Sequence, residues 1–258
     1  MNIRPAMLPL VSGVSSLLHP LTVWRYRGQQ VICPLCNGQF STFKPYGTKL
    51  ELARHHQLIS LGYRQQAVCP GCGSQERDRA VALYLAGRMI WLRSQPRPLL
   101  HIAPEKALGR YLARLTKPRY VSAACQRIDI TAIPHADDTF DVIVCNHVLE
   151  HIPDDRQALS ELYRVLKPAG FAILQVPYAR DLAETLESEV SKPVERLRHY
   201  GQPDHVRLYG LDYARRVRAC GFELEETTMR QRFGYTRVSR SGLIAEEKLF
   251  VASKPVAV

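Results

Sequence analysis

The stretch from residue 137 to residue 177 constrains the fold of this 258-residue chain more than any other part of the sequence. Residues 140–145 (FDVIVC) are a β-branched, apolar run, as in a strand that is buried on both faces. A helical pattern begins after Pro153 and ends at Pro168, and residues 171–176 (FAILQV) are a second apolar run. The order strand, helix, strand predicts a βαβ unit and therefore a parallel sheet.

Four of the seven cysteines stand in two Cys-x-x-Cys pairs. The pairs are Cys33 with Cys36 and Cys69 with Cys72. Two such turns that face each other offer four thiolates in a tetrahedron, which is the ligand set of a closed, structural Zn²⁺ site. A redox pair or plain buried thiols are the alternatives, but no thioredoxin-like unit surrounds the pairs. We therefore expect a zinc-binding module, with a helix over residues 49–60 between the pairs.

The net charge of +11 and the pI of about 9.5 favour anionic partners such as RNA, unless the charge is only a solvated basic face. No apolar run approaches the ~20 residues of a membrane span. Residues 1–24 are moderately apolar but interrupted by proline, and they predict a short helix rather than a signal peptide. An odd number of cysteines, mostly in metal-type pairs, suits the cytoplasm.

Several motifs resemble the class I S-adenosylmethionine-dependent methyltransferases. FDVIVCNHVLEHIPDD and ELYRVLKPAG are similar to the fourth strand and the following helix of that family. The two cysteine pairs, the segment QERDRA and the later HIAPE resemble a bacterial subset with a cysteine-rich front end. The resemblance implies a Rossmann-like α/β domain with a mostly parallel seven-stranded sheet at residues 96–258. A zinc-ribbon-like module with a connecting helix would occupy residues 25–95.

The same resemblance implies methyl transfer (EC 2.1.1.-) from S-adenosylmethionine to an unidentified acceptor. A small molecule or a glycan is favoured, and RNA is second. The alternative is a degenerate fold that serves as a binding module or catalyses a non-methylating reaction. Two departures from the family motivate that alternative: the loop after the first strand has no glycine, and Ala124 stands where an acid usually contacts the ribose.

The resemblance assigns cofactor contacts to the loops after the first, third and fourth strands. The first strand is expected over residues 98–103, the second over 120–123 and the third at 128–130, with a helix over 106–115. The aligned cofactor-binding positions are His101, Ala103, Pro104, Glu105, Asp129, Ile130, Asn146 and His147. For His101 the alternative is a hydrogen-bonded histidine of the core.

The acceptor side follows the fifth strand, with helices expected over residues 182–190 and 211–219. His205 is a candidate general base, and His151 is the second catalytic candidate. Arg207 and Tyr209 are candidate acceptor-binding residues, because a guanidinium holds an anionic group bidentately. The alternative is a turn whose histidine and arginine fix a loop to the sheet. Residues 221–228 and 246–252 are expected to form the terminal antiparallel pair.

His147, Glu150 and His151 also match the H-x-x-E-H signature of a metallopeptidase class. That chemistry needs both histidines on one helix face. Pro153 and the preceding strand disfavour a helix here, so the methyltransferase interpretation is preferred.

Overall fold

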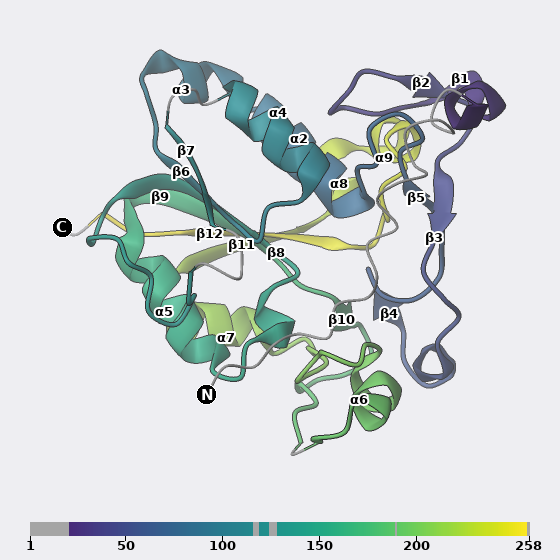
Figure 1. The fold of residues 1–258 in the computed structure, drawn as a ribbon. Helices are drawn as coiled ribbons and strands as arrows, with labels where there is room; N and C mark the ends of the chain where they lie inside the picture. The colour runs from purple at the N-terminus through teal and green to yellow at the C-terminus, as the bar shows by residue number, and fades with distance from the viewer. Residues whose placement is uncertain (1–20, 116–118, 124–127, 189, 257–258) are drawn as a thin grey trace.

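The computed structural model describes residues 21–115, 119–123, 128–188 and 190–256. Its centre is a six-stranded sheet with the order β11-β12-β9-β8-β6-β7 (Figure 1). The four parallel strands are β6 (Leu99–Ile102), β7 (Tyr120–Ala123), β8 (Phe140–Asn146) and β9 (Leu166–Gln175). The antiparallel pair is β11 (Glu223–Thr228) and β12 (Lys248–Ser253). The predicted parallel sheet and its antiparallel end are both confirmed.

Six strands, rather than the predicted seven, make up the sheet in the described part of the chain. Residues 128–130, expected as the third strand, are irregular and lead into a turn. The Asp129 carboxylate accepts hydrogen bonds from the amide and the hydroxyl of Thr131, at 2.8 and 2.6 Å. Such local bonding competes with strand pairing. Ala124 and Cys125, and most of the predicted N-terminal helix, lie outside the described residues.

Helices cover both faces of the sheet (Figure 1). One face carries α2 (Glu76–Ala86), α3 (Met89–Ser94) and α4 (Lys106–Leu115). The opposite face carries α5 (Asp155–Val165) and α7 (Tyr213–Ala219). Asp154 caps α5 by accepting a hydrogen bond from the amide of Gln157, at 2.9 Å. The predicted helices at 106–115 and after Pro153 are confirmed, and α7 begins two residues later than predicted.

The cysteine module consists of short antiparallel pairs and one turn of 3₁₀ helix. The pairs are β1 (Arg27–Ile32) with β2 (Gln39–Phe40) and β3 (Lys44–Tyr46) with β5 (Arg64–Val68). The helix predicted over residues 49–60 is wrong, because only η1 (Glu51–Arg54) is helical and β4 (Leu58–Ile59) follows it. β4 pairs with β10 (Tyr178–Ala179) of the sheet domain, so tertiary pairing overrides the local pattern.

The helix predicted over residues 182–190 is also wrong. This segment is irregular, and Leu186 exchanges two backbone hydrogen bonds of 2.9 Å with Leu208. The helix forms later, as α6 (Pro193–Tyr200), with a proline in its first turn and Gly201 in a left-handed conformation at its end. The remaining helical turns are η2 (Leu149–His151), α8 (Met229–Phe233) and α9 (Tyr235–Arg240). Among the described helices, none is both long and apolar enough to cross a lipid bilayer.

The connecting helix α2 belongs to the core of the sheet. It begins at Glu76, where Gln75 and Asp78 form a capping box. Val81 and Leu85 lie fully buried in the same apolar cluster as Val142 of β8. The cysteine module is therefore joined to the sheet through a shared core.

Arg79 of α2 is a fully buried cation whose five N–H groups all donate to backbone carbonyls. Two acceptors, Gln66 and Ala67, lie on β5, and Ser74 follows the second cysteine pair. Ser241 and Gly242, after α9, provide the other two. The guanidinium also stacks on the Phe43 ring, 4.0 Å from its centroid. One side chain thus joins three distant segments.

Glu247, which precedes β12, is 1% exposed and accepts a 2.6 Å hydrogen bond from the hydroxyl of Ser60. Burial raises the pKa of this carboxyl from 4.5 to about 7. The folded state therefore binds its proton more tightly than the unfolded state does. The contribution of Glu247 to stability is fully present below about pH 4.5 and is lost as the pH rises to about 7.

Replacing Arg79 by lysine tests the role of the buried guanidinium. Lysine offers three N–H donors for five buried carbonyls, and each carbonyl left without a partner costs about 1–3 kcal/mol. We expect Arg79→Lys to lower the free energy of unfolding in urea by about 3 kcal/mol or more. Arg54→Lys, on the exposed surface of η1, is the control and should leave the free energy of unfolding unchanged. Equal stability of the two variants would contradict the role given to Arg79.

Replacing Glu247 by glutamine tests the pH dependence of stability that the buried carboxyl causes. The amide keeps the acceptor for Ser60 and removes the titration. We expect Glu247→Gln to match the wild type at pH 5 and to exceed its stability at pH 8 by roughly 2–3 kcal/mol. Urea unfolding at both pH values measures the difference, with exposed Glu223→Gln as the control. A wild-type stability that does not fall between pH 5 and pH 8 relative to Glu247→Gln would refute the assignment.

Candidate functional site

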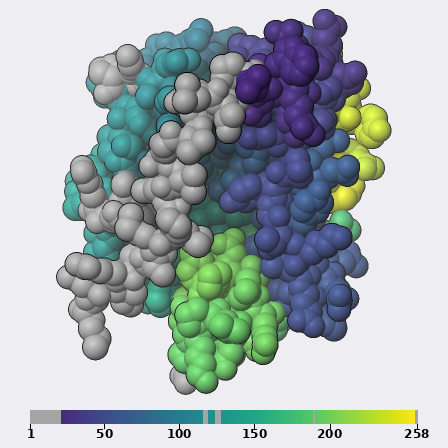
Figure 2. Space-filling model, turned by 45° about the vertical axis from the view of Figure 1, so that its right-hand side comes forward, coloured from purple at the N-terminus to yellow at the C-terminus, as the bar shows by residue number. Residues whose placement is uncertain are grey.

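A cavity of about 530 Å³ opens at the carboxyl end of β8, between the sheet and the cysteine module. Its lining includes Tyr46, Thr48, Leu61 and Arg64 of the module, Gln75 and Arg77 at the start of α2, His147, Glu150 and His151 after β8, and Gly201 and Gln202 after α6. In Figure 2 the module, purple to blue, and the green segment near residue 200 lie side by side. Open α/β sheets bind ligands at this edge.

Glu105 follows the turn after β6, and its side chain is bound by side chains of β6, α2 and β8. Its carboxylate accepts hydrogen bonds from His101 of β6 at 2.9 Å, Arg77 of α2 at 3.3 Å and Asn146 of β8 at 3.3 Å. Burial alone would raise the pKa of Glu105, but the hydrogen bond from His101 and the charge of Arg77 hold it below its usual value. The other His101 nitrogen lies 3.0 Å from the Tyr120 hydroxyl, and the ring is fully buried. This placement matches the core alternative for His101.

The turns after β6 and β8 both contain a residue in the left-handed region. Ala103 has φ +47° and His147 has φ +52°. Such values favour glycine and cost a side-chain-bearing residue roughly 1 kcal/mol or more. The HIAPE loop therefore takes a glycine-type turn at Ala103 although it contains no glycine. Strain of this kind concentrates at functional sites.

Several buried polar atoms beside the cavity have no hydrogen-bond partner among the described residues. They are Asn146 Oδ1, His147 Nε2, both carboxylate oxygens of Glu150, and His205 Nε2. Buried polar atoms are almost always paired, so these atoms require a partner from outside the protein, which is water, an ion or a ligand. Burial raises the pKa of Glu150 to about 8.

The two predicted catalytic histidines lie together, their ring centroids 4.7 Å apart. His205 Nδ1 lies 3.1 Å from the Tyr200 carbonyl oxygen, and His151 Nδ1 lies 3.4 Å from an Asp204 carboxylate oxygen. Burial lowers the pKa of His205 to about 4 and also lowers that of His151. Both imidazoles are therefore neutral near pH 7. His151 lines the cavity, whereas His205 lies behind it at 1% exposure.

Arg207 and Tyr209 face the protein rather than the cavity. Arg207 donates to the carbonyls of Leu149, Ile152 and Pro153 and to the Glu187 carboxylate. The Tyr209 hydroxyl, fully buried, donates to Asp155 at 2.8 Å. These contacts match the alternative in which this segment fixes the loop after β8, and they leave little of either side chain for an acceptor.

The remaining predicted cofactor positions are spread along the edge of the sheet. Pro104 is half-buried in the turn after β6, and the exposed Asp129 holds its own turn. Ile130 is 4% exposed and belongs to the core cluster beneath α5. Glu150 and Arg77 were not among the predicted site residues. The H-x-x-E-H spacing is the sequence signal that contains Glu150, and it predicts a peptidase site rather than this one.

The peptidase geometry is absent from this region. Only Leu149–His151 are helical, as one 3₁₀ turn, and His147 stands before it in the left-handed conformation. The two histidines therefore do not share a helix face.

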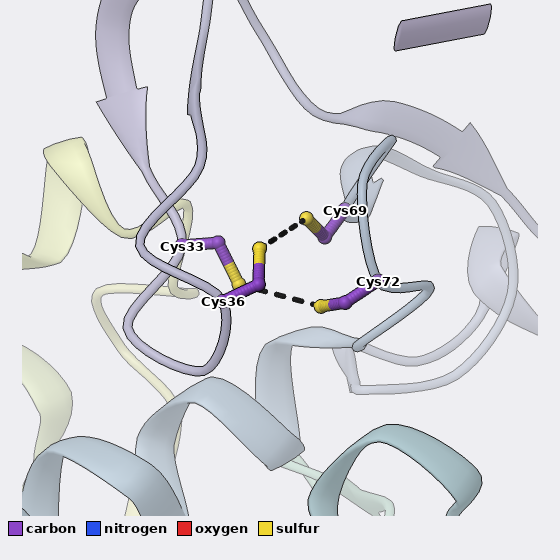
Figure 3. A group of neighbouring side chains, drawn as sticks. All are labelled: Cys33, Cys36, Cys69 and Cys72. Carbon is purple, nitrogen blue, oxygen red and sulfur yellow. Dashed lines mark hydrogen bonds between the residues drawn. The ribbon is translucent and has the colours of Figure 1, made fainter. Parts of the chain in front are cut away.

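The four paired cysteines converge on one point (Figure 3). Cys33 Sγ lies 3.6 Å from Cys72 Sγ, and Cys36 Sγ lies 3.8 Å from Cys69 Sγ. A tetrahedron with metal–sulfur bonds of ~2.3 Å has sulfur–sulfur edges of ~3.8 Å. These separations fit one Zn²⁺ held by four thiolates.

The two cysteine turns follow the same backbone path. In each, the first cysteine donates its N–H to the carbonyl five residues on, at 3.0 Å for Cys33 and 2.9 Å for Cys69. Each also accepts from the amide four residues on. That fourth residue is left-handed in both turns: Asn37 at φ +59° and Gly73 at φ +78°. In the first turn this position is taken by an asparagine, and Gly38 follows it.

Residues 95–174 match the family model described as a methyltransferase domain. Demethylmenaquinone methyltransferase of Lactiplantibacillus plantarum is 33% identical over 151 residues, which are 52% of this chain and 58% of that protein. The uncharacterized methyltransferase YcgJ of Bacillus subtilis is 37% identical over 76 residues, 30% of this chain and 28% of that protein. This chain thus spans less than two thirds of either relative.

Among solved structures, phosphoethanolamine N-methyltransferase 2 of Haemonchus contortus, in complex with S-adenosyl-L-methionine, aligns with a TM-score of 0.42. The identity is 15%, over 67% of this chain and 53% of that chain. The family match and the sequence relatives show that the central part of this chain is similar to a methyltransferase domain.

Proposed function

We propose that the chain is an S-adenosylmethionine-dependent methyltransferase whose acceptor enters the cavity between the sheet and the cysteine module. One observation carries the proposal. The segment that matches the methyltransferase domain carries buried, unpartnered polar atoms of Asn146, His147 and Glu150 at the end of β8, and His147 and Glu150 line this cavity. A bound ligand, or water that a ligand displaces, would satisfy them.

The donor would be held at the ends of β6 and β8. The chemistry of the residues there suits its amino-acid part, because Asn146 Oδ1 is a free acceptor for an ammonium and Arg77 is a cation for a carboxylate. The left-handed turn at Ala103 gives this loop the backbone path of a glycine-type turn. Asp129, at the edge of the sheet, is the proposed contact of the adenine amino group. Bound S-adenosylmethionine supplies an electrophilic methyl group on a sulfonium.

Methyl transfer depends mainly on in-line placement of donor and nucleophile. A base is needed where the acceptor is protonated at the working pH. His151 is the proposed base, because it lines the cavity, is neutral near pH 7 and has its other nitrogen beside Asp204. His205, packed edge-on against it, supports the same position.

The acceptor is proposed to be a small molecule or a glycan unit. A cavity of about 530 Å³ lies within the ~300–1,000 Å³ of small-molecule sites. Arg64 and Arg77 line it, so an acceptor with an anionic group is favoured. RNA is the second candidate because of the net charge of +11. The cytoplasmic location stays a prediction from the use of cysteine.

The turn after β6 favours a second candidate function, a binding module or a non-methylating enzyme. The Glu105 carboxylate already has three protein partners, and the loop that usually approaches the donor has no glycine. The donor-binding experiment below separates the two candidates.

The module is proposed to hold one structural Zn²⁺ through Cys33, Cys36, Cys69 and Cys72. The four sulfurs lie within 4.8 Å of one another, and no position of the tetrahedron is left for a substrate. Zinc would therefore fix the two turns against each other rather than take part in the reaction.

Titration calorimetry of the zinc-replete protein with S-adenosylhomocysteine tests the donor site. We expect micromolar binding. Asp129→Asn keeps the local turn but removes the charge, and we expect it to weaken binding about tenfold through the loss of one charge-assisted hydrogen bond. Asp137→Asn, an exposed neighbour, is the matched control. Absence of binding up to millimolar ligand, in folded protein, would support the binding-module candidate instead.

Replacing Cys36 by serine tests the zinc site with the least damage to packing, because Cys36 is the exposed member. We expect elemental analysis to show the loss of one equivalent of zinc per chain, together with a lower Tm. Cys220→Ser, a half-buried thiol on the opposite face of the sheet, should keep the wild-type zinc content. Unchanged zinc in Cys36→Ser would exclude the four-thiolate site.

A further inference from the structure

Beside the cavity, three side chains from two distant segments aim potential metal ligands at one point. Glu150 and His151 come from the turn after β8, and His205 comes from the segment after α6. One ligand atom of each lies within 4.8 Å of the other two. His147 lies beside the group, with its Nδ1 3.4 Å from Glu150 Oε1. None of these residues belongs to the cysteine cluster.

Glu150 is the unusual member of the group. Its side chain is 1% exposed, yet neither carboxylate oxygen has a hydrogen-bond partner in any other described residue. A buried carboxylate without a partner costs several kcal/mol. Imidazole nitrogens of His147 and His151 lie 3.4 and 4.0 Å from Glu150 Oε1. A cation between the carboxylate and the imidazoles would give the unpartnered oxygen and nitrogen atoms a common partner.

The imidazoles are oriented for this role by their outer contacts. His205 Nδ1 lies 3.1 Å from the Tyr200 carbonyl oxygen, which can only accept, so Nδ1 carries the proton and the Nε2 lone pair is free. His151 Nδ1 faces the Asp204 carboxylate at 3.4 Å, which likewise leaves its Nε2 for the cluster. A carbonyl or carboxylate behind each histidine is the usual support of a metal ligand.

We propose that Glu150, His151 and His205 bind a divalent transition-metal ion at the wall of the cavity. Imidazole nitrogens with one carboxylate suit Zn²⁺, Fe²⁺ or Co²⁺ better than Mg²⁺ or Ca²⁺, which prefer oxygen ligands. His147, Glu150 and His151 also line the cavity, so an open coordination position would face it.

The consequence for the acceptor rests on the proposed function. A metal ion at the cavity wall would select an acceptor that offers it an oxygen atom, such as an alcohol, a phenol or a carboxylate. His151 and His205 would then be ligands rather than proton acceptors. Metal binding itself does not depend on methyl transfer, so it is tested without an activity measurement.

The test is a titration of the full chain with Co²⁺, followed by visible absorption. The thiolate site is first loaded with zinc, and loosely bound metal is removed with a chelator. We expect one equivalent of Co²⁺ with d–d bands and without the sulfur-to-cobalt charge-transfer band that exchange into the cysteine site would give. No bound Co²⁺, or only Co²⁺ with that charge-transfer band, would overturn the proposal.

Two variants localise the ion without disturbing the core. Asp204, 62% exposed, supports His151 only from outside, and Asp204→Asn should weaken Co²⁺ binding about 10–100-fold. His151→Ala removes a ligand that is 31% exposed and should weaken it further. His55→Ala, an exposed histidine of the module, should bind as the wild type does. Equal binding by His151→Ala, shown folded by circular dichroism, would place the ion elsewhere and refute the site.

The same preparations separate this proposal from the proposed function. Calorimetry with S-adenosylhomocysteine on the Co²⁺-free protein reports the donor site alone. Donor binding without Co²⁺ binding would overturn only the metal site, and the reverse result would overturn only the donor site.

Discussion

The architecture depends on one buried guanidinium. Arg79 lies in the first turns of α2, and its five N–H groups bind carbonyls of β5, of the second cysteine turn and of the segment after α9. A charge in such a place is stable only when all its donors are paired. Arg79 also lies near the cysteine turns. Four thiolates around a divalent cation would carry two net negative charges, and these would offset part of the cost of burying the guanidinium. The cation therefore suits a metal-filled cysteine site.

Shorter links complete the attachment of the module to the sheet. β4 pairs with β10, Ser60 donates to the buried Glu247, and Arg77 reaches Glu105. The cavity is bounded by surfaces that these contacts hold in place. Its lining comes from the module, from α2, from the loop after β8 and from the end of α6, so neither the module nor the sheet forms it alone.

The sequence predicted the parts of this structure that arise from local patterns. Apolar runs such as residues 140–145 identified the parallel strands, because a strand buried on both faces leaves a continuous signal. Residues 49–60 and 182–190 look helical but pair with distant backbone, and pairing partners cannot be read from periodicity. Within the site, the sequence predicted both His151 and His205 as catalytic candidates, and the two side chains lie next to each other. The full burial of Tyr209 and the use of Arg207 by three carbonyls depend on tertiary packing, which the motif alone did not reveal.

Three consecutive residues at the start of α2 serve three different purposes. Arg77 faces the cavity and Glu105, Asp78 closes the helix cap, and Arg79 extends toward the cysteine turns. A group bound by the four sulfurs and a ligand bound in the cavity therefore act on the same helical turn. If a bound group at the sulfurs and a ligand in the cavity both favour this one arrangement of the turn, the two binding equilibria share a coupling free energy, and each affinity rises when the other site is filled.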